Sequence, residues 1–397
     1  MILPETGWRT RPDLIRLTEA LGSREGLVRY VGGAVRDALL GLPVSDLDLA
    51  TALLPDEVSR RVKAAGFKAV PTGIAHGTIT AVLPSGPVEV TTLRRDVSTD
   101  GRRATVAFTD DWREDAARRD FTINALSADP VSGEVHDYFG GLDDVLAGLV
   151  RFIGDPLARI AEDHLRILRF FRFHARFGRG APDPAGLEAC AARANDLMAL
   201  SRERIAQELL KLLSVAAPVP TVALMVERRI FTAVIPEIDA ASVERLARLV
   251  TRERAYGADP LRRLAALLPA DPALADLVGA RLKLSKAQRK RLTLAAQGGE
   301  PSPARALAHA IGVEAARDRL LLHAVSPDEG MAALADWKVP RFPLTGGELL
   351  KMGLSAGPVV AATMQAVERQ WVKESFPDEA RVREIAKELV AQALRAR

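Results

Sequence analysis

The chain has 397 residues, of which 48% are hydrophobic and 27% charged, as in ordinary globular proteins, and its length exceeds what one hydrophobic core usually serves. Its single cysteine, Cys190, excludes an intramolecular disulfide and a thiolate zinc cluster, and its six scattered histidines argue against a histidine metal centre. No apolar run approaches the roughly 18 residues of a membrane span, so we expect a cytoplasmic protein without membrane contact.

Residues 30–51 read YVGGAVRDALLGLPVSDLDLAT, and the pattern predicts three short elements. Apolar residues at 27–31 and 47–51 indicate strands, and the segment 34–40 between them indicates a helix. Short strands and helices continue to alternate along the following hundred residues, after which helical periodicity takes over to the end of the chain. The sequence therefore predicts an α+β fold, with a mixed sheet and helices first and an all-α remainder.

The same segment carries the first candidate site residues. Gly32 and Gly33 would let backbone N–H groups approach a triphosphate, and Arg36 follows in the first helical turn. Because side chains alternate along a strand, Asp46 and Asp48 would project from one side, about 7 Å apart, and could share a divalent metal. Nucleotidyl transfer needs such a pair, because Mg²⁺ polarises the α-phosphate and neutralises the leaving pyrophosphate. Each pattern alone is often only a polar strand edge or a turn.

Residues 76–96, HGTITAVLPSGPVEVTTLRRD, indicate two strands joined by a Pro-Ser-Gly-Pro turn. On the second strand Glu89 and Thr91 share one face, and the valines between them face the other way. Glu89 is therefore a candidate third catalytic carboxylate beside the aspartate pair. The alternative is an ordinary exposed strand glutamate.

Residues 118–126, RRDFTINAL, place two arginines and an aspartate directly before an apolar helix. Arg119 and Asp120 could hold a ribose through charge-assisted bonds to its hydroxyls, although the same residues could merely cap the helix. Asn124 lies in the same stretch, and the sequence assigns it no role.

Residues 162–178, EDHLRILRFFRFHARFG, predict one helix. Its arginines follow spacings of three and four and should form one stripe, with Asp163 one turn before Arg166 on the same face. Without context, an exposed salt bridge between these two residues would be the simplest interpretation. Arg169 continues the stripe as a further candidate for nucleotide binding.

The charge is uneven along the chain. Residues 241–397 carry 25 Lys and Arg against 18 Asp and Glu, whereas residues 1–240 carry 30 against 33. A basic half suggests a polyanionic partner, and the densest run, RLKLSKAQRKRL, offers four candidate RNA-binding residues: Lys286, Arg289, Lys290 and Arg291. A solvated helix face is the competing interpretation, because the run lacks the interleaved aromatic residues of a base-stacking surface.

These motifs together resemble a known family. GGAVRDALLG followed by SDLDLAT is similar to the nucleotide-binding signature of the class II tRNA nucleotidyltransferase and bacterial poly(A) polymerase superfamily. RRDFTINAL resembles its ribose-recognition motif, and ED-x-x-R resembles its base-recognition motif, in which one Asp and one Arg read the incoming nucleotide. The resemblance implies a catalytic head over 1–150, a helical neck with the base-reading helix over 151–235, and a tRNA-binding body and tail over 236–397.

The base preference follows from hydrogen-bonding edges. Cytosine and adenine both present an exocyclic amine beside a ring-nitrogen acceptor, so Asp163 could accept from the amine while Arg166 donates to the ring. Guanine and uracil present a carbonyl beside a ring N–H, which would set acceptor against acceptor and donor against donor. CTP and ATP therefore fit the pair.

Within the superfamily, the chain most resembles the CCA-adding enzymes, which implies addition of the 3′-terminal CCA to tRNA with Mg²⁺, and contact with the acceptor stem and T arm. Three alternatives stay open: a poly(A) polymerase, a relative that adds only CC or only A, and a non-catalytic RNA-binding protein. The stretch PTGIAHGTITAV lacks the arginines of the polymerases, and the loop 96–111 looks long enough for addition of the final A. The sequence indicates no obligate protein partner.

Overall fold

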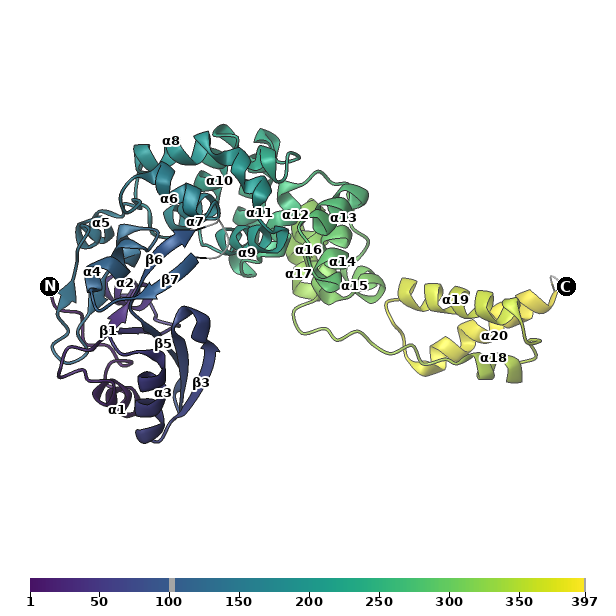
Figure 1. Ribbon diagram of the computed structural model, residues 1–397. Coiled ribbons are helices and arrows are strands. Elements are labelled where there is room, and N and C mark those ends of the chain that lie inside the picture. Colours follow the sequence, from purple (N-terminus) through teal and green to yellow (C-terminus); the bar gives the residue numbers. More distant parts are fainter. Residues whose placement is uncertain (100–103, 396–397) are drawn as a thin grey trace. The chain divides into compact units, whose positions relative to one another are not determined.

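The computed structural model describes residues 1–99 and 104–395 and divides the chain into two compact units, Met1–Ala240 and Ala241–Arg397. Figure 1 shows a sheet with helices in the first unit and helices throughout the second. The predicted α+β class is confirmed. The predicted domain limits after residues 150 and 235 remain predictions, because the first compact unit includes both the predicted head and the predicted neck.

Seven strands form one mixed sheet in the order β3-β4-β5-β2-β1-β8-β9. Only β2 and β5 run parallel among the strand pairs described in this sheet, and the other neighbours are antiparallel. The strands are β1 (Val28–Val31), β2 (Asp48–Thr51), β3 (Lys68–Gly73), β4 (Thr78–Leu83), β5 (Gly86–Thr92), β8 (Ser127–Ala128) and β9 (Val135–His136).

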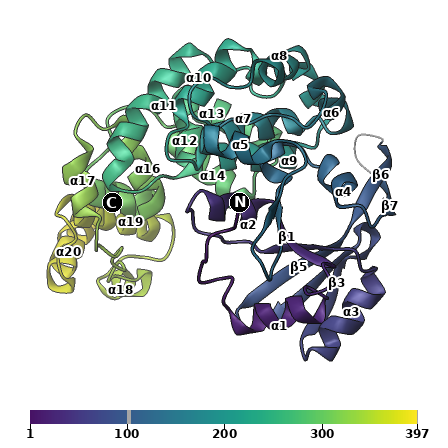
Figure 2. The same ribbon diagram turned by 90° about the vertical axis from the view of Figure 1, so that its left-hand side faces the viewer.

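One face of this sheet is buried and the other carries polar groups. Along β5, Val88 and Val90 are buried whereas Glu89 between them is exposed, as the alternation of a half-buried strand requires. Helices α1 (Pro12–Ala20) and α3 (Pro55–Ala64) lie side by side, and α3 packs on β3, β4 and β5 (Figure 2). Functional side chains are therefore free to gather on the uncovered face.

A separate hairpin follows the sheet. Strands β6 (Arg94–Thr99) and β7 (Ala104–Phe108) pair with each other and occupy most of the predicted loop 96–111. Residues 100–103 of that loop lie outside the described residues. Helix α4 (Trp112–Ala117) contacts β6 and leads directly into the RRDFTINAL motif.

Helices complete the first unit, and one of them differs from the prediction. The single helix expected over 162–178 is wrong: α6 ends at Glu162 and α7 begins at Arg166. Asp163 interrupts the helix in an extended conformation, and its side chain accepts a hydrogen bond from the backbone N–H of Leu165, because a short acidic side chain competes for backbone donors at a helix start. The helices are α2 (Gly33–Leu39), α5 (Gly141–Ala147), α6 (Pro156–Glu162), α7 (Arg166–Phe177), α8 (Pro184–Ala192), α9 (Arg202–Leu213) and α10 (Val219–Glu227).

The described part of the second unit is helical. Its last three helices enclose a core of their own around Trp371, with Leu349, Val382 and Ile385. No helix in the described part of the chain is both long and apolar enough to cross a membrane. The helices are α11 (Ala240–Arg252), α12 (Pro260–Leu267), α13 (Pro272–Arg281), α14 (Lys286–Ala295), α15 (Ala304–Ile311), α16 (Val313–His323), α17 (Pro327–Ala333), α18 (Gly346–Lys351), α19 (Pro358–Lys373) and α20 (Glu379–Arg395).

Candidate active site

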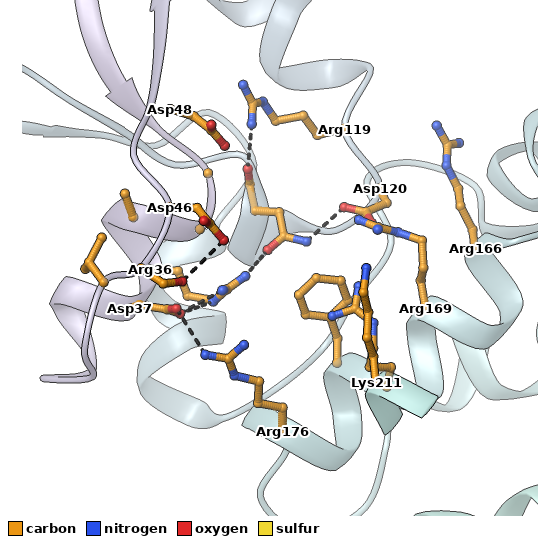
Figure 3. A pocket seen from close by; sticks show the side chains of 18 of the residues that line it. Arg36, Asp37, Asp46, Asp48, Arg119, Asp120, Arg166, Arg169, Arg176 and Lys211 are labelled. Atoms are coloured by element: carbon orange, nitrogen blue, oxygen red, sulfur yellow. Dashed lines mark hydrogen bonds and ion pairs between the residues drawn. The ribbon is translucent and has the colours of Figure 1, made fainter. Parts of the chain in front are cut away.

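A cavity of about 690 Å³ in the first unit brings most of the predicted site residues together. Figure 3 shows Asp46 and Asp48 on one side of it and Arg166 and Arg169 of α7 on the other. Its predicted lining residues are Gly32, Gly33, Arg36, Asp46, Asp48, Arg119, Asp120, Asp163, Arg166 and Arg169.

The glycine pair forms a turn that only glycine suits. Gly32 has φ 65°, and a Cβ built on it would stand 2.9 Å from the Arg119 guanidinium. A side chain there would therefore be strained and would displace a predicted ribose contact. Gly33 begins α2, so the turn presents bare backbone to the cavity.

The aspartates are placed by β2, with one correction to the predicted geometry. Asp48 begins β2, whereas Asp46 lies in the preceding irregular segment, so the two do not share one strand. Glu89 pairs directly across from Asp48 on the parallel strand β5, which puts both side chains on the uncovered face. Desolvation, together with the charges of Glu89 and Asp46, raises the pKa of Asp48, although Arg119 opposes the shift. The strand register thus makes Glu89 a neighbour of the pair.

These carboxylates suit a divalent cation by their chemistry. Hard oxygen donors are what Mg²⁺ prefers, and the carboxylates of Asp46, Asp48 and Glu89 supply such donors. Among the described residues, no three His, Cys, Asp or Glu side chains are already gathered into a metal site. A bound cation would therefore have to draw Asp46, Asp48 and Glu89 closer together.

The predicted ribose motif is hydrogen-bonded to α7, the helix predicted to read the base. Arg169 Nε donates to Asp120 Oδ2 at 2.7 Å, and the amide of Asn124 donates to Asp120 Oδ1 at 2.9 Å. Burial alone would raise the pKa of Asp120, but Arg169 and these hydrogen bonds lower it overall, so the carboxylate stays charged. Asp120 is therefore a permanent acceptor at the cavity wall.

Asn124, to which the sequence assigned no role, connects two parts of the site. Its carbonyl oxygen accepts a short hydrogen bond from Arg36, while its amide holds Asp120. Arg36 is buried, donates to Asp37 at 2.8 Å and lies over the ring of Phe177. The helix after the glycine turn is thus linked through one amide to the ribose motif (Figure 3). No sequence spacing could reveal this, because Asn124 and Arg36 are 88 positions apart.

Asp163 and Arg166 both line the cavity, but they do not pair with each other as the simple salt-bridge interpretation assumed. Arg204 of α9 donates to Asp163 Oδ2 at 2.7 Å. Arg166 instead donates to Glu162 at 2.6 Å and to the backbone carbonyl of Arg118 at 3.3 Å. Separate partners hold the two groups, so one acceptor and one donor face the cavity independently.

Three further cations escaped the sequence prediction. Arg172 and Arg176 continue the α7 stripe into the cavity, and Lys211 reaches it from α9. Arg176 pairs with Asp37 at 3.3 Å, and Arg172 donates to the buried Glu208 at 2.5 Å. The spacing of three and four identified the stripe, whereas membership of the cavity depends on how α9 packs on α7.

The candidate RNA-binding run lies on α14 in the second unit and is not uniform. Lys286 and Lys290 are exposed. Arg291 is largely buried and pairs with Asp318 at 2.6 Å, and Arg289 forms a two-pronged pair with Asp276. The two arginines are therefore engaged within the protein, and the two lysines face solvent.

Comparison with known proteins places this geometry in a family context. A family model described as "Poly A polymerase head domain" matches residues 28–151, and one described as "Probable RNA and SrmB- binding site of polymerase A" matches residues 181–242. A mouse protein named "CCA tRNA nucleotidyltransferase 1, mitochondrial" is 35% identical over 91% of this chain and 86% of its own length. A "CCA-adding enzyme" of Lacticaseibacillus paracasei is 32% identical over 93% and 95%. The crystal structure of the Bacillus stearothermophilus CCA-adding enzyme with CTP matches with a TM-score of 0.77 and 26% identity, covering 97% of this chain and all of that one.

Proposed function

The chain belongs to the CCA tRNA nucleotidyltransferase family, and on that premise we propose how its own residues add the 3′-terminal CCA of tRNA from CTP and ATP. One observation carries the proposal. A single cavity combines a glycine turn, two aspartates, the ribose motif and the Asp163 and Arg166 pair. A nucleoside triphosphate has parts that match each of these groups in turn.

Among the described residues, seven cations and five carboxylates line the cavity, which suits a ligand with several negative charges. The cations come from α2, the ribose motif, α7 and α9, so several segments of the chain contribute positive charge to the cavity. We assign Gly32 and Gly33 to the phosphates, and Arg119 and Asp120 to the ribose hydroxyls. The cations are Arg36, Arg119, Arg166, Arg169, Arg172, Arg176 and Lys211, and the carboxylates are Asp37, Asp46, Asp48, Asp120 and Asp163.

Enzymes of this family use a divalent metal ion, and we propose Mg²⁺ held by Asp46 and Asp48, with Glu89 as third carboxylate. When bound, the ion would polarise the α-phosphate and make the attacking hydroxyl more acidic. The protein contributes the placement of these carboxylates: the parallel register of β2 and β5 sets Asp48 and Glu89 on one face, and Asp46 lies in the irregular segment just before β2. Arg119 lies close enough to Asp48 to oppose the rise in its pKa that burial causes, and so favours the ionised form of this carboxylate.

We assign base selection to Asp163 and Arg166. Asp163 offers an acceptor to the exocyclic amine of cytosine or adenine, and Arg166 offers a donor to the ring nitrogen. Separate anchors support this division, because Arg204 orients the carboxylate and Glu162 orients the guanidinium. A uracil or guanine edge would set a carbonyl acceptor against Asp163 and a ring N–H donor against Arg166, which is costly in a desolvated site.

The test uses tRNA transcripts that end before the CCA, after CC and after CCA. Each is incubated with one nucleotide at a time and then with CTP and ATP together, and the products are sequenced. Addition of CC from CTP and of A only after CC is the expected result. A run of A on every transcript would indicate a poly(A) polymerase, which the names of the matched family models keep in view. No addition at all would indicate a non-catalytic RNA-binding protein.

The tRNA itself would be held by its acceptor stem and T arm, with Lys286, Arg289, Lys290 and Arg291 as the predicted RNA contacts. The exposure of Lys286 and Lys290 supports a phosphate contact for the two lysines. A cytoplasmic location also remains a prediction, since the mouse and human relatives are named as mitochondrial proteins.

A further inference from the structure

A second cavity lies wholly within the second unit, whereas the first cavity, that of the proposed active site, belongs to the first unit. It measures about 150 Å³. Helices α12, α14 and α16 pack on one another, each of them ends at this cavity, and α11 forms the remaining wall (Figure 1). The apolar lining residues are alanines and leucines, most of them buried, so the cavity is a recess between helices.

The titratable side chains that line the second cavity are all basic, within the part of the chain that the structure describes. Arg245, Arg248 and Arg252 come from α11, and their spacings of three and four put them on one stripe of that helix. His323 comes from the end of α16. Among the described lining residues there is no carboxylate, so no acid in the wall balances the arginines.

Helix capping explains part of this charge. The last carbonyl oxygens of a helix lack intrahelical donors, and cations are favourable beside them. Arg245 donates to a carbonyl of α12, Arg252 to one of α16 and His323 to the last one of α14, at 3.0, 3.3 and 2.8 Å. These bonds cover carbonyls that would otherwise repel an anion. They leave Nη1 of Arg245 and Nε and Nη2 of Arg252 without a protein acceptor among the described contacts.

Two further arginines serve no helix end. Arg248 is exposed and makes no hydrogen bond or ion pair among the described residues. Arg319, one turn before His323 on α16, is only 7% exposed, and its buried Nε has no hydrogen-bond partner. Its one described contact is with the side-chain oxygen of Gln297 at 3.5 Å, and burial lowers its pKa. A buried charge without a counter-ion is costly, and an anion nearby would offset that cost.

His323 lies in the electric field of these arginines. Burial lowers the pKa of its imidazole, and the charges of Arg319 and Arg252 lower it further, although the bond to α14 opposes the shift. The ring is therefore neutral at pH 7, and the positive charge at the cavity is that of the arginines alone.

We propose that the second cavity binds a small phosphate-class oxyanion, inorganic phosphate or pyrophosphate, which holds the end of α16 against α11. The planar fork of arginine matches the oxygens of such an ion, and the volume corresponds to roughly ten water molecules. A backbone phosphate of RNA carries a sugar on each side, which a recess of buried alanines and leucines would exclude, whereas a free ion enters alone. Binding of this ion goes beyond the proposed function and does not depend on it.

Hydrogen exchange of the full-length protein, followed by mass spectrometry of its peptides, tests the proposal. Millimolar inorganic phosphate should slow the exchange of backbone amides in α11 and α16, in a saturable way, with CTP present to occupy the first cavity. Arg248→Gln removes a donor that contacts no other described residue, so the fold should be unchanged. Half-maximal protection should then need at least about tenfold more phosphate, the scale of one charge-assisted hydrogen bond. The same titration with pyrophosphate shows which of the two ions binds more tightly.

Arg254→Gln is the matched control, because Arg254 follows α11, is exposed and does not line the cavity. It should leave the phosphate dependence unchanged. Equal shifts in the two variants, or no saturable protection of α11 and α16 in the wild-type protein, would overturn the proposal. Radiolabelled phosphate in equilibrium dialysis separates the remaining source. Its displacement by tRNA in the presence of CTP would assign the cavity to an RNA phosphate and refute a free ion.

A third variant tests the counter-ion role. Arg319→Met replaces the buried charge by an apolar side chain of similar length, so it should raise the Tm of the ion-free protein. Phosphate should then raise Tm less in Arg319→Met than in the wild-type protein. An equal rise in both proteins would contradict an ion that offsets the charge of Arg319.

Discussion

Two arginine-rich helices, α7 in the first unit and α14 in the second, carry similar charge but use it differently. On α7, Arg166, Arg169, Arg172 and Arg176 all line the first cavity while pairing with acids from other segments. On α14, Arg291 contacts three carboxylates that belong to neighbouring parts of the same unit. Charge density in the sequence is therefore a poor guide to a ligand site by itself.

The balance of charge around each helix explains the difference. The cavity beside α7 has more cations than carboxylates, and two of those carboxylates are assigned to a metal ion. A cavity of about 660 Å³ beside α14 has three arginines against three carboxylates: Arg262, Arg291 and Arg317 against Asp259, Glu314 and Asp318. An uncompensated surplus attracts an anionic ligand, whereas a balanced set holds helices together.

The largest expected effect concerns Asp46 and Asp48, the carboxylates of the first cavity that we propose as metal ligands. Asp46→Ala or Asp48→Ala should lower kcat by about 10³-fold or more, because metal-ion stabilisation is worth several kcal/mol and each 1.4 kcal/mol is a factor of ten. Binding of tRNA, measured by filter retention, should change little. Asp56→Ala removes an exposed carboxylate from α3 and serves as control. Near-normal turnover of both variants at saturating Mg²⁺ would remove the proposed active site.

On the α14 side, the largest effect should be on stability. Arg291→Ala would leave Asp318, which is 1% exposed, without its main partner, and breaking a buried pair costs about 3–5 kcal/mol of unfolding free energy. Burial raises the pKa of Asp318 even though Arg291 opposes the shift. A carboxyl with a raised pKa takes up a proton more readily in the folded protein. The unfolding free energy that Arg291→Ala loses should therefore be smaller at pH 5 than at pH 8.

Denaturant melts at both pH values measure this effect. Arg289→Ala on the same helix is the control, because its pair with Asp276 is about half exposed and should contribute far less. Equal stability of the two variants would mean that Arg291 is not part of a structural network, and the contrast with α7 would fail.

The sequence predicted which residues line the first cavity better than it predicted the contacts among them. Asp46, Asp48, Arg119 and Asp120 come from separate segments, and the structure gathers all four in one cavity because their motifs end at the same region of the sheet. The helix break at Asp163 was missed, since periodicity alone does not register a side chain that bonds to the backbone.

The sequence also did not predict which side chains pair when they lie far apart in the chain. Glu208 of α9 is buried against Arg172, and Arg204 of the same helix holds Asp163. Ser201 occupies the N-cap position of α9, but its side chain makes no capping bond among the described contacts. Which arginine meets which acid depends on helix packing, and no local pattern encodes it.

A smaller effect should separate the roles of Asp163 and Arg166, the residues that we propose to read the base. Asp163→Ala removes the acceptor for an exocyclic amine and frees Arg204, so discrimination of CTP from UTP should fall by about 1–3 kcal/mol. Arg166→Ala should instead lower kcat/KM for CTP and ATP alike, because each offers its ring nitrogen to that donor. Comparison of kcat/KM for all four nucleotides on tRNA lacking CCA measures both effects.

Asp163→Ala combined with Arg204→Ala sharpens this test. If the freed Arg204 is what accommodates the carbonyl of uracil, kcat/KM for UTP should rise in Asp163→Ala and fall again in the double variant. The double variant should still lack the wild-type preference for CTP. A wild-type ratio of CTP to UTP in Asp163→Ala would mean that this carboxylate only anchors α9 and that the base is read elsewhere.

The smallest expected effect concerns the part of the α14 run that faces solvent. Replacing Lys286 and Lys290 together by alanine should weaken tRNA binding and flatten its dependence on salt, by about one unit of log–log slope for each phosphate that the protein no longer neutralises. CTP binding should not change. Replacing Lys63 and Lys68 in the first unit removes the same charge from exposed positions outside the run, so it separates a local contact from the effect of net charge. If both pairs shift the slope equally, the α14 lysines act only through the general field of the protein. If neither shifts it, the whole run is a solvated helix face, and the basic half must hold tRNA with other residues.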